Sequence, residues 1–365
     1  MLTERSRIPI RQILTLGILP SPLKKLIYRL AGYRIGKGVR FAFGSVVTGR
    51  DVEIGDHTRF GLLCSVRGDR IRIGAHVQIG AMTLIDTPTV EIGDGTKFNE
   101  QVFVGGLQYP DARFVVGRNC LIMQMTYINP CRSIVIGDDS GVGVNSLLIG
   151  HSSWGSKFEG YPVDFEPIVI GNSVAIAWRV TVLPGTRIQD GAVIGANSLV
   201  KGTIPPRCLA VGFPARVVAR EPYLPRRVSP EEKVRYLRTI VAELGEHLTA
   251  HGFPALLDGD VLRVQVRRRP QRLHVAYAPV PDPTTTALPD LEAGDVFLSL
   301  FALPAPCRQV LTERDVVWVD IEHKQRSDHG SDLGEEAIQY LKRYGVRLLR
   351  VRPEDPPPSP SPFPA

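Results

Sequence analysis

The chain has few cysteines, and their arrangement does not indicate a disulfide framework or a zinc site. Cys64, Cys120, Cys131, Cys208 and Cys307 are odd in number, widely spaced and form no Cys-X-X-Cys pair. Free cysteines in this pattern are typical of a reducing compartment. The sequence therefore argues against a secreted, disulfide-stabilised protein.

Long hydrophobic runs are also missing. The best apolar stretch, residues 13–23, is interrupted by Pro20 and Pro22 and is too short to cross a bilayer. No secretory signal peptide is recognisable. We therefore expect a cytoplasmic protein, with the inner face of the membrane as a further place of action.

Positive charge is concentrated at one end of the chain. The formal net charge is +7, yet residues 1–40 alone carry nine Lys and Arg and one acidic residue, while the rest is nearly balanced. A nucleic-acid-binding protein needs a basic face along its main body. The sequence therefore argues against nucleic acid as a partner.

A repeat of six residues organises the middle of the chain. From Ile170 to Val200, an aliphatic residue stands at every sixth position, and the same spacing continues backward in triplets to Ile35. The positions run from Ile35, Phe41 and Val47 in the first triplet to Ile188, Ile194 and Val200 in the last. Neither a helix nor a single strand explains a period of six, whereas triangular coils of three short strands do. We expect a mainly β protein, a parallel β-helix of about eight coils over residues 35–220.

Two insertions interrupt the period. Residues 105–115 add a few residues between coils, and sixteen extra residues precede Ile170. Loops on rigid scaffolds commonly carry function. His151 stands where the longer insertion begins, and its imidazole can accept a proton near neutral pH. From the residues alone, His151 is equally well a catalytic base or a solvated surface histidine.

The segments on either side of the repeat lack its period. Residues 1–34 form a basic leader that is expected to be helical, with Leu23, Leu26, Ile27 and Leu30 on one helix face. This helix is expected to cap the open end of the coils, to lie on an anionic membrane surface, or both. Residues 221–352 predict a small α+β module of unassigned role, and residues 353–365 a disordered Pro-rich tail. Within this module, Asp320, Glu322 and Lys324 are interpreted as polar residues that leave a buried strand.

Motifs in the last coils resemble a known family. LPG at 183–185, IGANSLV at 194–200 and GFPARVV at 212–218 follow one another in order, and LKKLIYRLAGYRIGKGV opens the match at 23–39. Together, over roughly residues 20–220, they resemble the hexapeptide-repeat acyltransferases, a left-handed β-helix group that includes sugar and polysaccharide O-acetyltransferases. The resemblance implies a left-handed β-helix, acetyl-CoA as acyl donor, and a homotrimer with active-site grooves between its subunits.

The same resemblance assigns roles to individual residues. It implies that His151 is the general base of a direct acetyl transfer. The donor's pantetheine arm would lie near Ala177 and Ala196, with Trp178 as a displaced aromatic beside it. Lys201 and Arg216 match positions where basic residues meet the nucleotide phosphates, a role that suits their chemistry.

Acceptor recognition is less regular than donor recognition. Glycoside-acetylating members of the family tend to carry an asparagine one coil before the base, and Asn129 or Asn145 is the candidate in this chain. Trp154 is expected to stack on a sugar ring or to pack under its own loop. His57 and His76 share a corner of successive coils, but the sequence offers no third ligand, so no metal site is predicted.

The leading hypothesis is an acetyl-CoA-dependent O-acetyltransferase acting on a sugar or surface-polysaccharide hydroxyl. The basic leader, residues 1–34, fits peripheral contact with a membrane that carries lipid-linked glycans. An N-acetyltransferase for an amino sugar or a xenobiotic amine would share every residue named above. A non-catalytic β-helical scaffold is the remaining alternative, and such a scaffold would not bind acetyl-CoA.

Overall fold

The computed structural model describes residues 9–152, 155–266, 269–280 and 288–355. These residues form two compact units, which divide between Arg227 and Val228. Each unit has a hydrophobic core of its own. The division lies a few residues after residue 220, where the six-residue period ends.

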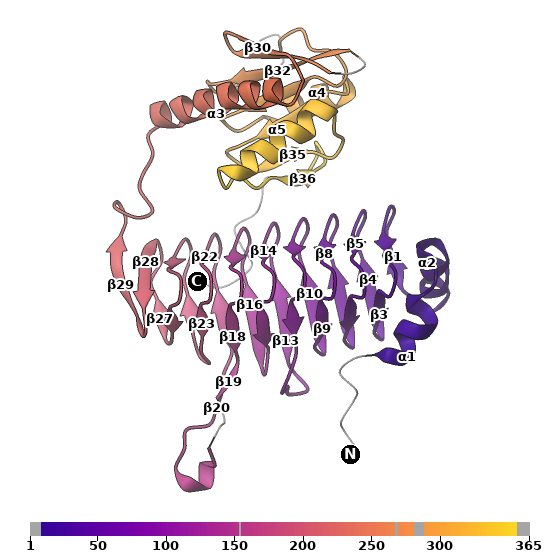
Figure 1. Cartoon of the computed structure of the whole chain (residues 1–365), viewed down its shortest axis with the longest axis vertical. Helices are drawn as coiled ribbons and strands as arrows, with labels where there is room; N and C mark the ends of the chain where they lie inside the picture. The colour runs from indigo at the N-terminus through magenta and orange to yellow at the C-terminus, as the bar shows by residue number, and fades with distance from the viewer. Residues whose placement is uncertain (1–8, 153–154, 267–268, 281–287, 356–365) are drawn as a thin grey trace. The chain divides into compact units, whose positions relative to one another are not determined.

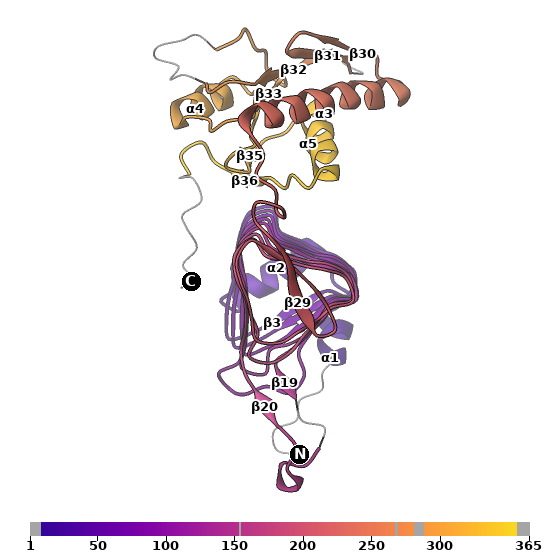
Figure 2. The same ribbon diagram turned by 90° about the vertical axis from the view of Figure 1, so that its left-hand side faces the viewer.

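The first unit is a left-handed parallel β-helix with a triangular cross-section (Figures 1 and 2). Its described residues complete eight coils, in each of which the chain passes through sheets A, B and C in turn. Sheet A contains β1 (Arg34–Ile35), β4 (Asp51–Ile54), β7 (Arg70–Ile73), β10 (Thr89–Ile92), β13 (Arg113–Val116), β16 (Ser133–Ile136), β21 (Ile168–Ile170), β24 (Arg187–Ile188) and β27 (Thr203–Ile204). Sheet B contains β2 (Arg40–Phe41), β5 (Arg59–Phe60), β8 (Gln78–Ile79), β11 (Lys97–Phe98), β14 (Leu121–Ile122), β17 (Gly141–Val142), β22 (Ala175–Ile176), β25 (Val193–Ile194), β28 (Cys208–Gly212) and the antiparallel β29 (Ala215–Arg220). Sheet C contains β3 (Val46–Thr48), β6 (Ser65–Arg67), β9 (Leu84–Asp86), β12 (Phe103–Val104), β15 (Tyr127–Asn129), β18 (Leu147–Ile149), β23 (Thr181–Val182) and β26 (Leu199–Val200).

The hydrophobic residues of the six-residue period form the core of this prism. Every residue of the predicted triplets, from Ile35 to Val200, is buried. Equivalent residues of successive coils are register partners, such as Ile54 with Ile73, so like side chains stack in rows along the axis. The rings of Phe41 and Phe60, for example, are stacked with centroids 4.7 Å apart. The spacing in the sequence thus gives correct inward positions throughout the β-helix.

The three corners of the prism differ in how much chain they contain. In the eight complete coils, four residues connect sheet A to sheet B at each A–B corner, and four connect sheet B to sheet C at each B–C corner; the last A–B connection, from β27 to β28, has three. The C–A corner instead varies from two residues to the long segment between β18 and β21. Both interruptions of the period therefore lie at the C–A corner.

Side chains bind backbone groups of neighbouring coils at the A–B corner. The Asp56 carboxylate accepts a hydrogen bond from the backbone N–H of Lys37 in the preceding coil, at 2.6 Å. Asp94 does the same for the N–H of Ala75, also at 2.6 Å. Because each carboxylate joins one turn to the next, these acidic residues stabilise the stack.

The leader caps the open end of the first coil with polar side chains. It contains α1 (Ile10–Gln12), the π-helical turn η1 (Ile13–Gly17) and α2 (Ser21–Leu30). The buried Nζ of Lys24 donates to the backbone carbonyl oxygens of Ala42 (2.8 Å) and Ser45 (3.1 Å). The Tyr28 hydroxyl accepts from the N–H of Val47 at 2.9 Å. The helix thus satisfies edge groups of the first coil that would otherwise lack strand partners.

The apolar face of α2 is exposed rather than turned to the coils. Leu23, Leu26 and Leu30 are all exposed, Leu30 at 79%. The sequence pattern would normally place such a face on the core. Here the open end of the coils presents backbone N–H and C=O groups, so hydrogen-bonding side chains cover it and the leucines remain outside.

The second unit is a mixed seven-stranded sheet with helices on both faces. In chain order its elements are α3 (Pro230–Ala250), β30 (Ala255–Asp258), β31 (Val261–Gln265), β32 (Pro270–Ala276), β33 (Val296–Ser299), α4 (Ala305–Glu313), β34 (Val317–Asp320), β35 (Gln325–Ser327), α5 (Asp332–Arg343) and β36 (Leu349–Val351). Helices α3 and α5 share one core with the sheet, whereas Leu311 of α4 packs with Phe297 and Trp318 on the opposite face. The sequence did not predict β30, α4 or β35.

The structure also bears on the expectations about membrane-spanning segments and cysteines. Among the described residues, no helix combines the length and apolar character that a membrane span requires. All five cysteines are free and buried.

Candidate functional site

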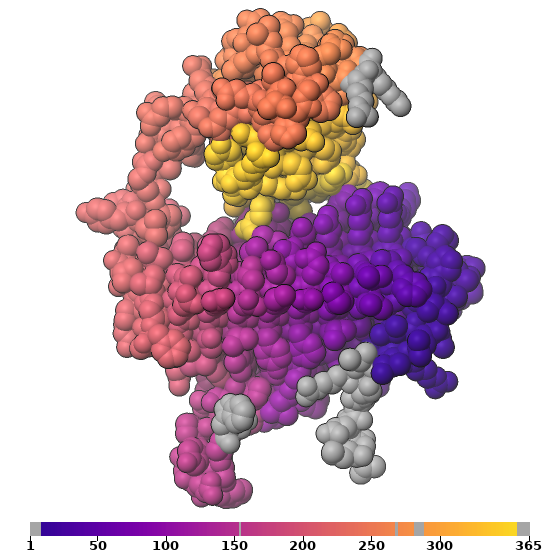
Figure 3. Space-filling model, in the orientation of Figure 1, coloured from indigo at the N-terminus to yellow at the C-terminus, as the bar shows by residue number. Residues whose placement is uncertain are grey.

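The longer insertion forms an arm that leaves the C–A corner beside β18. Its two sides are β19 (His151–Ser152) and β20 (Asp164–Phe165), which pair antiparallel, with the short helix η2 (Lys157–Glu159) beyond them. The arm projects from the prism in both ribbon views and in the space-filling view (Figures 1, 2 and 3). His151 is thus the first residue of the arm, directly beyond the rigid coil.

The root of the arm is tightly fixed to the preceding coil. The Gly150 N–H donates to the carbonyl oxygen of Asn129 at 2.9 Å, and the Glu166 N–H donates to the carbonyl oxygen of Gly150. A Cβ atom at Gly150 would lie 2.7 Å from that Asn129 oxygen and 3.1 Å from the Cys131 nitrogen. Glycine therefore lets the chain pass close to the previous coil and holds the His151 backbone in place.

Two polar side chains in this region each have a buried atom without a hydrogen-bond partner. The Nδ1 atom of His151 and the Oδ1 atom of Asn129 are buried without a hydrogen-bond partner among the described residues. Asn129 is 1% exposed and lies one coil before His151, at the end of β15. Buried polar atoms without partners are uncommon in folded proteins and favour a site that a ligand completes. Of the two predicted asparagines, Asn129 is the one whose backbone contacts the root of the arm, through Gly150.

Aromatic residues line the outer side of this region. The ring of Phe165, the strand partner of His151, contacts the Tyr109 ring edge to face at 5.6 Å. The guanidinium of Arg132 lies 3.6 Å above the Tyr109 ring. The thiol of Cys131 is buried nearby, and burial raises its pKa, so this cysteine stays a neutral thiol rather than a nucleophile.

The chain has relatives among curated proteins, although no family model matches it. Galactoside O-acetyltransferase of Escherichia coli (strain K12) is 31% identical over 144 residues, which cover 37% of this chain and 66% of that protein. A provisionally named lipopolysaccharide biosynthesis O-acetyl transferase of the same organism is 31% identical over 113 residues, 28% of this chain and 58% of that protein. These relatives support the resemblance to the hexapeptide-repeat acyltransferases that the sequence motifs indicate. It spans less than two thirds of the length of either relative.

Solved structures of hexapeptide-repeat proteins also match the chain. A galactoside acetyltransferase in complex with coenzyme A is 26% identical, and the match covers 36% of this chain and 64% of that one, with a TM-score of 0.24. This score is too low for the structural likeness to support an argument. The site of this hexapeptide-repeat protein is therefore built from its own residues.

Most residues that the family resemblance assigns to the acyl donor lie near the B–C corner of the last coils. Ala177 and Trp178 follow β22, and Ala196 follows β25, the next strand of sheet B. The side chain of Trp178 is 63% exposed. Arg216 on β29 pairs with Val211, whose side chain lies against Gly195 at the same corner.

Lys201 lies apart from the other donor residues. It follows β26 at the C–A corner, two coils beyond the coil that ends in His151, and it is exposed. Thus one prism places His151 and Lys201 at one corner and Trp178 and Arg216 at another. A donor that contacts both groups needs surfaces that a single prism does not bring together.

Asn145, the other predicted asparagine, does not lie at the root of the arm. Asn145 lies at the B–C corner, at the opposite end of β18 from the arm, with a left-handed backbone (φ 57°). Trp154 lies outside the described residues. Asn145 therefore adds nothing to the site at the root of the arm.

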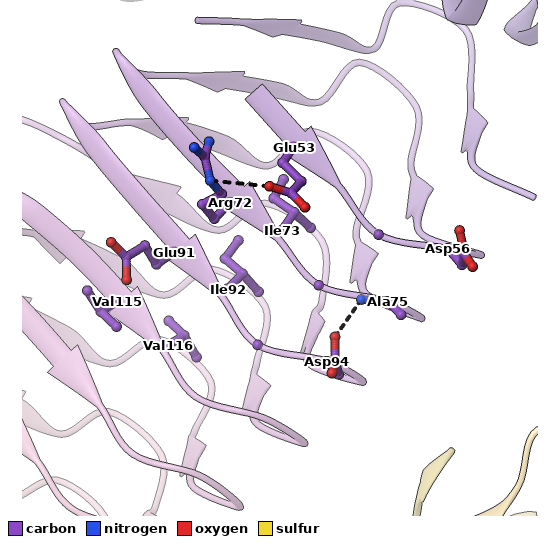
Figure 4. Close-up of a pocket in the computed structure, with 13 residues that line it drawn as sticks. Glu53, Asp56, Arg72, Ile73, Ala75, Glu91, Ile92, Asp94, Val115 and Val116 are labelled. Atoms are coloured by element: carbon purple, nitrogen blue, oxygen red, sulfur yellow. Dashed lines mark hydrogen bonds and ion pairs between the residues drawn. The ribbon is translucent and has the colours of Figure 1, made fainter. Parts of the chain in front are cut away.

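A hollow of about 610 Å³ lies on sheet A and the A–B corner (Figure 4). Its charged residues are already paired. Arg72 contacts Glu53 at 3.5 Å, and Asp94 accepts from the Ala75 N–H as described above. These interactions join neighbouring coils, so the hollow is explained by the architecture of the stack.

Other titratable clusters also have structural explanations. The rings of His57 and His76 stack at the A–B corner with centroids 5.2 Å apart. No group of three or more His, Cys, Asp or Glu in the described part of the chain could hold a metal ion. In the second unit, buried Asp320 accepts hydrogen bonds from the Leu303 N–H and from the N–H of His323, which orders the turn after β34.

Sequence reasoning missed Tyr109 and Gly106, both in the 105–112 loop between β12 and β13. A Cβ atom at Gly106 would lie 2.0 Å from the Asn129 Nδ2 atom and 3.0 Å from the Tyr127 hydroxyl. The insertion itself was visible as a break in the period. The contact of Gly106 with Asn129 was not visible in the sequence, because this contact depends on how far the loop folds back over the next coil.

Proposed function

We propose that this chain transfers an acetyl group from acetyl-CoA to a sugar hydroxyl, with His151 as general base. The observation that carries the proposal is the pair of buried, unsatisfied polar atoms on His151 and Asn129 at the root of the arm. The identity to two proteins named O-acetyltransferases supports the reaction class. The rigid coil supports the role of base, because the hydrogen bond between Gly150 and Asn129 fixes the backbone next to His151.

The proposed chemistry is direct transfer. The His151 imidazole takes the proton from the acceptor hydroxyl as its oxygen attacks the thioester carbonyl. The C–S bond then breaks, coenzyme A leaves as a thiol that recovers the proton, and the acetyl group remains on the acceptor as an ester. Asn129 orients the acceptor by a hydrogen bond through its free Oδ1 atom. No residue of the protein becomes acylated.

The decisive experiment compares two histidine variants. His151→Ala is expected to lower kcat by about 10²- to 10⁴-fold, the usual contribution of a general base, with unchanged affinity for coenzyme A in calorimetry. His57→Ala is the matched control, because His57 lies at the A–B corner of another coil, away from the arm. Full turnover by His151→Ala would contradict the assignment. A wild-type protein that does not bind acetyl-CoA would favour the scaffold hypothesis.

The nature of the acceptor atom is tested on the product. An acetyl ester is cleaved by mild base, whereas an acetamide survives the same treatment. We expect the radiolabelled acetyl group to be released in mild base. Its retention would favour the N-acetyltransferase alternative.

We also propose that the working enzyme is a homotrimer in which two copies share each donor site. The separation of Lys201 and Arg216 onto two corners supports this arrangement, since a neighbouring copy can supply the second corner. His151→Ala and Arg216→Ala subunits, each poorly active alone, should regain activity when they are co-expressed. Mixed trimers then contain some sites with both native residues, so no recovery would mean that each chain holds a complete site.

Residues 1–34 are proposed to bring the enzyme to an anionic membrane surface. The exposed Leu23, Leu26 and Leu30 lie on one helix that also carries Lys25 and Arg29, a pattern suited to the bilayer interface. Wild-type protein should co-sediment with phosphatidylglycerol vesicles at low salt, and Leu26→Glu should reduce this binding severalfold.

A matched control for the vesicle experiment comes from the second unit. Leu256 is also exposed, at 66%, but belongs to β30. Leu256→Glu should therefore leave vesicle binding unchanged. Equal loss in both variants, or no binding by wild type, would contradict membrane contact through the leader.

A further inference from the structure

A second open space lies on the C–A corner, on the N-terminal side of His151. This pocket, of about 620 Å³, has a floor on sheet C formed by β6, β9 and β12. The 105–112 loop forms one wall through Gly106, Leu107 and Gln108, and the turns at 68–69 and 87–88 form another. The shorter insertion therefore builds a pocket at the same corner from which the longer insertion leaves.

Gly105 and Gly106, which line the pocket, link it to Asn129 of the proposed acceptor site. Gly105 donates its N–H to the carbonyl oxygen of Ile128, so the loop begins against the strand that carries Asn129. Gly106, which lines the pocket, approaches the Asn129 amide so closely that only a glycine fits. Pocket, Asn129 and His151 thus follow one another along the corner, one strand of sheet C after the next.

The charges in this pocket are compensated. Arg67 binds Asp86 through two contacts, Nε to Oδ1 at 2.8 Å and Nη2 to Oδ2. The Gln108 amide nitrogen donates to the carbonyl oxygen of Asp86 at 2.5 Å and to the Thr87 hydroxyl at 3.2 Å. A phosphate or a carboxylate needs a cation that is not already matched by an anion. The pocket therefore suits an uncharged ligand with hydroxyl groups.

Phe103 of the floor belongs to an aromatic pair on sheet C. The rings of Phe103 and Tyr127, on adjacent strands, are stacked with centroids 5.5 Å apart and planes 4° apart. Leu84 is the strand partner of Phe103 on the other side. A flat apolar surface beside hydroxyl-binding polar groups is the usual composition of a small-molecule site. It is well matched to a sugar ring, which has an apolar face and polar edges.

We propose that this pocket binds sugar units remote from the reacting hydroxyl, so that the preferred acceptor is an uncharged oligosaccharide or polysaccharide. At a strand spacing of about 4.8 Å, β12 lies roughly 10 Å and β6 roughly 19 Å from the strand that leads to His151. One hexose ring does not span that distance, whereas a short glycan does. This inference rests on the proposed function and specifies its acceptor.

The test uses neutral acceptors of two lengths. Methyl glycosides of glucose, galactose, mannose and N-acetylglucosamine are compared with tetrasaccharides of the same sugars, with UDP-galactose as a charged acceptor. For at least one sugar, wild-type kcat/KM should be about tenfold or more higher for the tetrasaccharide. Phe103→Leu and Asp86→Asn should lower kcat/KM for that tetrasaccharide by about threefold to tenfold and leave the methyl glycoside unchanged.

A matched control removes an ion pair elsewhere in the same stack. Glu91 and Arg113 join adjacent strands of sheet A at 3.4 Å, as Asp86 and Arg67 join strands of sheet C. Glu91→Gln should therefore leave both acceptor classes unchanged. It also reports any general effect of losing one inter-coil ion pair.

The outcomes separate this inference from the proposed function. Three results overturn the inference alone: no tetrasaccharide has a higher kcat/KM than its methyl glycoside, UDP-galactose is the preferred acceptor, or Phe103→Leu lowers kcat/KM equally for both acceptor lengths. The inference is also overturned if the enzyme acetylates none of these acceptors. The proposed function fails only if acetyl-CoA binding or His151-dependent turnover is also absent.

Discussion

Gly106→Ala should impair acceptor use by displacing a side chain rather than by removing one. Gly106 has a φ of 117°, in a region that residues with a Cβ atom rarely adopt. The added methyl carbon would lie 2.0 Å from the Asn129 Nδ2 atom. Asn129 is buried, so its amide must rotate or shift to admit the methyl group. The hydrogen bond that we assign to its Oδ1 atom would then be lost.

The size of the effect can be estimated separately for folding and for turnover. A positive φ at a residue other than glycine costs of the order of 1–3 kcal/mol, which should lower the free energy of unfolding by about that amount. One net hydrogen bond contributes about 0.5–1.5 kcal/mol, so kcat/KM for a methyl glycoside should fall by about 2- to 12-fold. Affinity for coenzyme A should not change, because the donor residues lie in later coils.

A double-mutant cycle tests whether the effect passes through Asn129. The kcat/KM of wild type, Gly106→Ala, Asn129→Ala and the double variant is measured with a methyl glycoside, beside urea unfolding of each. If Gly106→Ala acts by displacing Asn129, it should cause little further loss in the Asn129→Ala background. An undiminished loss in that background would refute the reasoning.

Two further predictions concern the cap on the first coil. Lys24→Met should lower the free energy of urea unfolding by about 1–3 kcal/mol, because buried carbonyl oxygens of Ala42 and Ser45 lose their donor. An unchanged unfolding midpoint would mean that these carbonyls find other partners. Tyr28→Phe should also destabilise the protein at neutral pH, because the N–H of Val47 loses its acceptor. Burial raises the pKa of Tyr28 from 10.0 to about 12, so between these pH values the unfolded chain loses its proton first. Unfolding curves should therefore show wild type losing its advantage over Tyr28→Phe as the pH rises from 10 to 12.

The six-residue period was sufficient to predict the β-helix because its signal is purely apolar. One inward position in every six must be hydrophobic to fill the prism, and all predicted positions are buried. Strand β35 shows the opposite case. Its residues Gln325, Arg326 and Ser327 are all buried, and Arg326 is neutralised by Glu335 of α5. A buried polar strand has no hydrophobic pattern, so composition and spacing could not reveal it.

The site was predicted in part for similar reasons. His151 could be proposed because the insertion that follows it is visible as a gap in the period. Asn129 and Asn145 could not be distinguished, since both lie within an uninterrupted stretch of sequence. Their difference arises from the corner that each occupies. Asn129 ends β15 at the C–A corner, from which the arm leaves, whereas Asn145 lies in the B–C turn before β18. A choice between them requires the register of the coils.

The location of the site follows from which corner can change length. At the A–B and B–C corners, buried hydroxyls and carboxylates bind backbone groups of adjacent coils, as Thr58 does with the carbonyl of Gly74 and the N–H of Val77. An extra residue there would move these partners out of reach in two coils at once. The C–A corner varies from two residues to eighteen within one continuous stack, so it tolerates insertions. Function that depends on inserted loops can therefore develop at this corner, and both the pocket and His151 lie there.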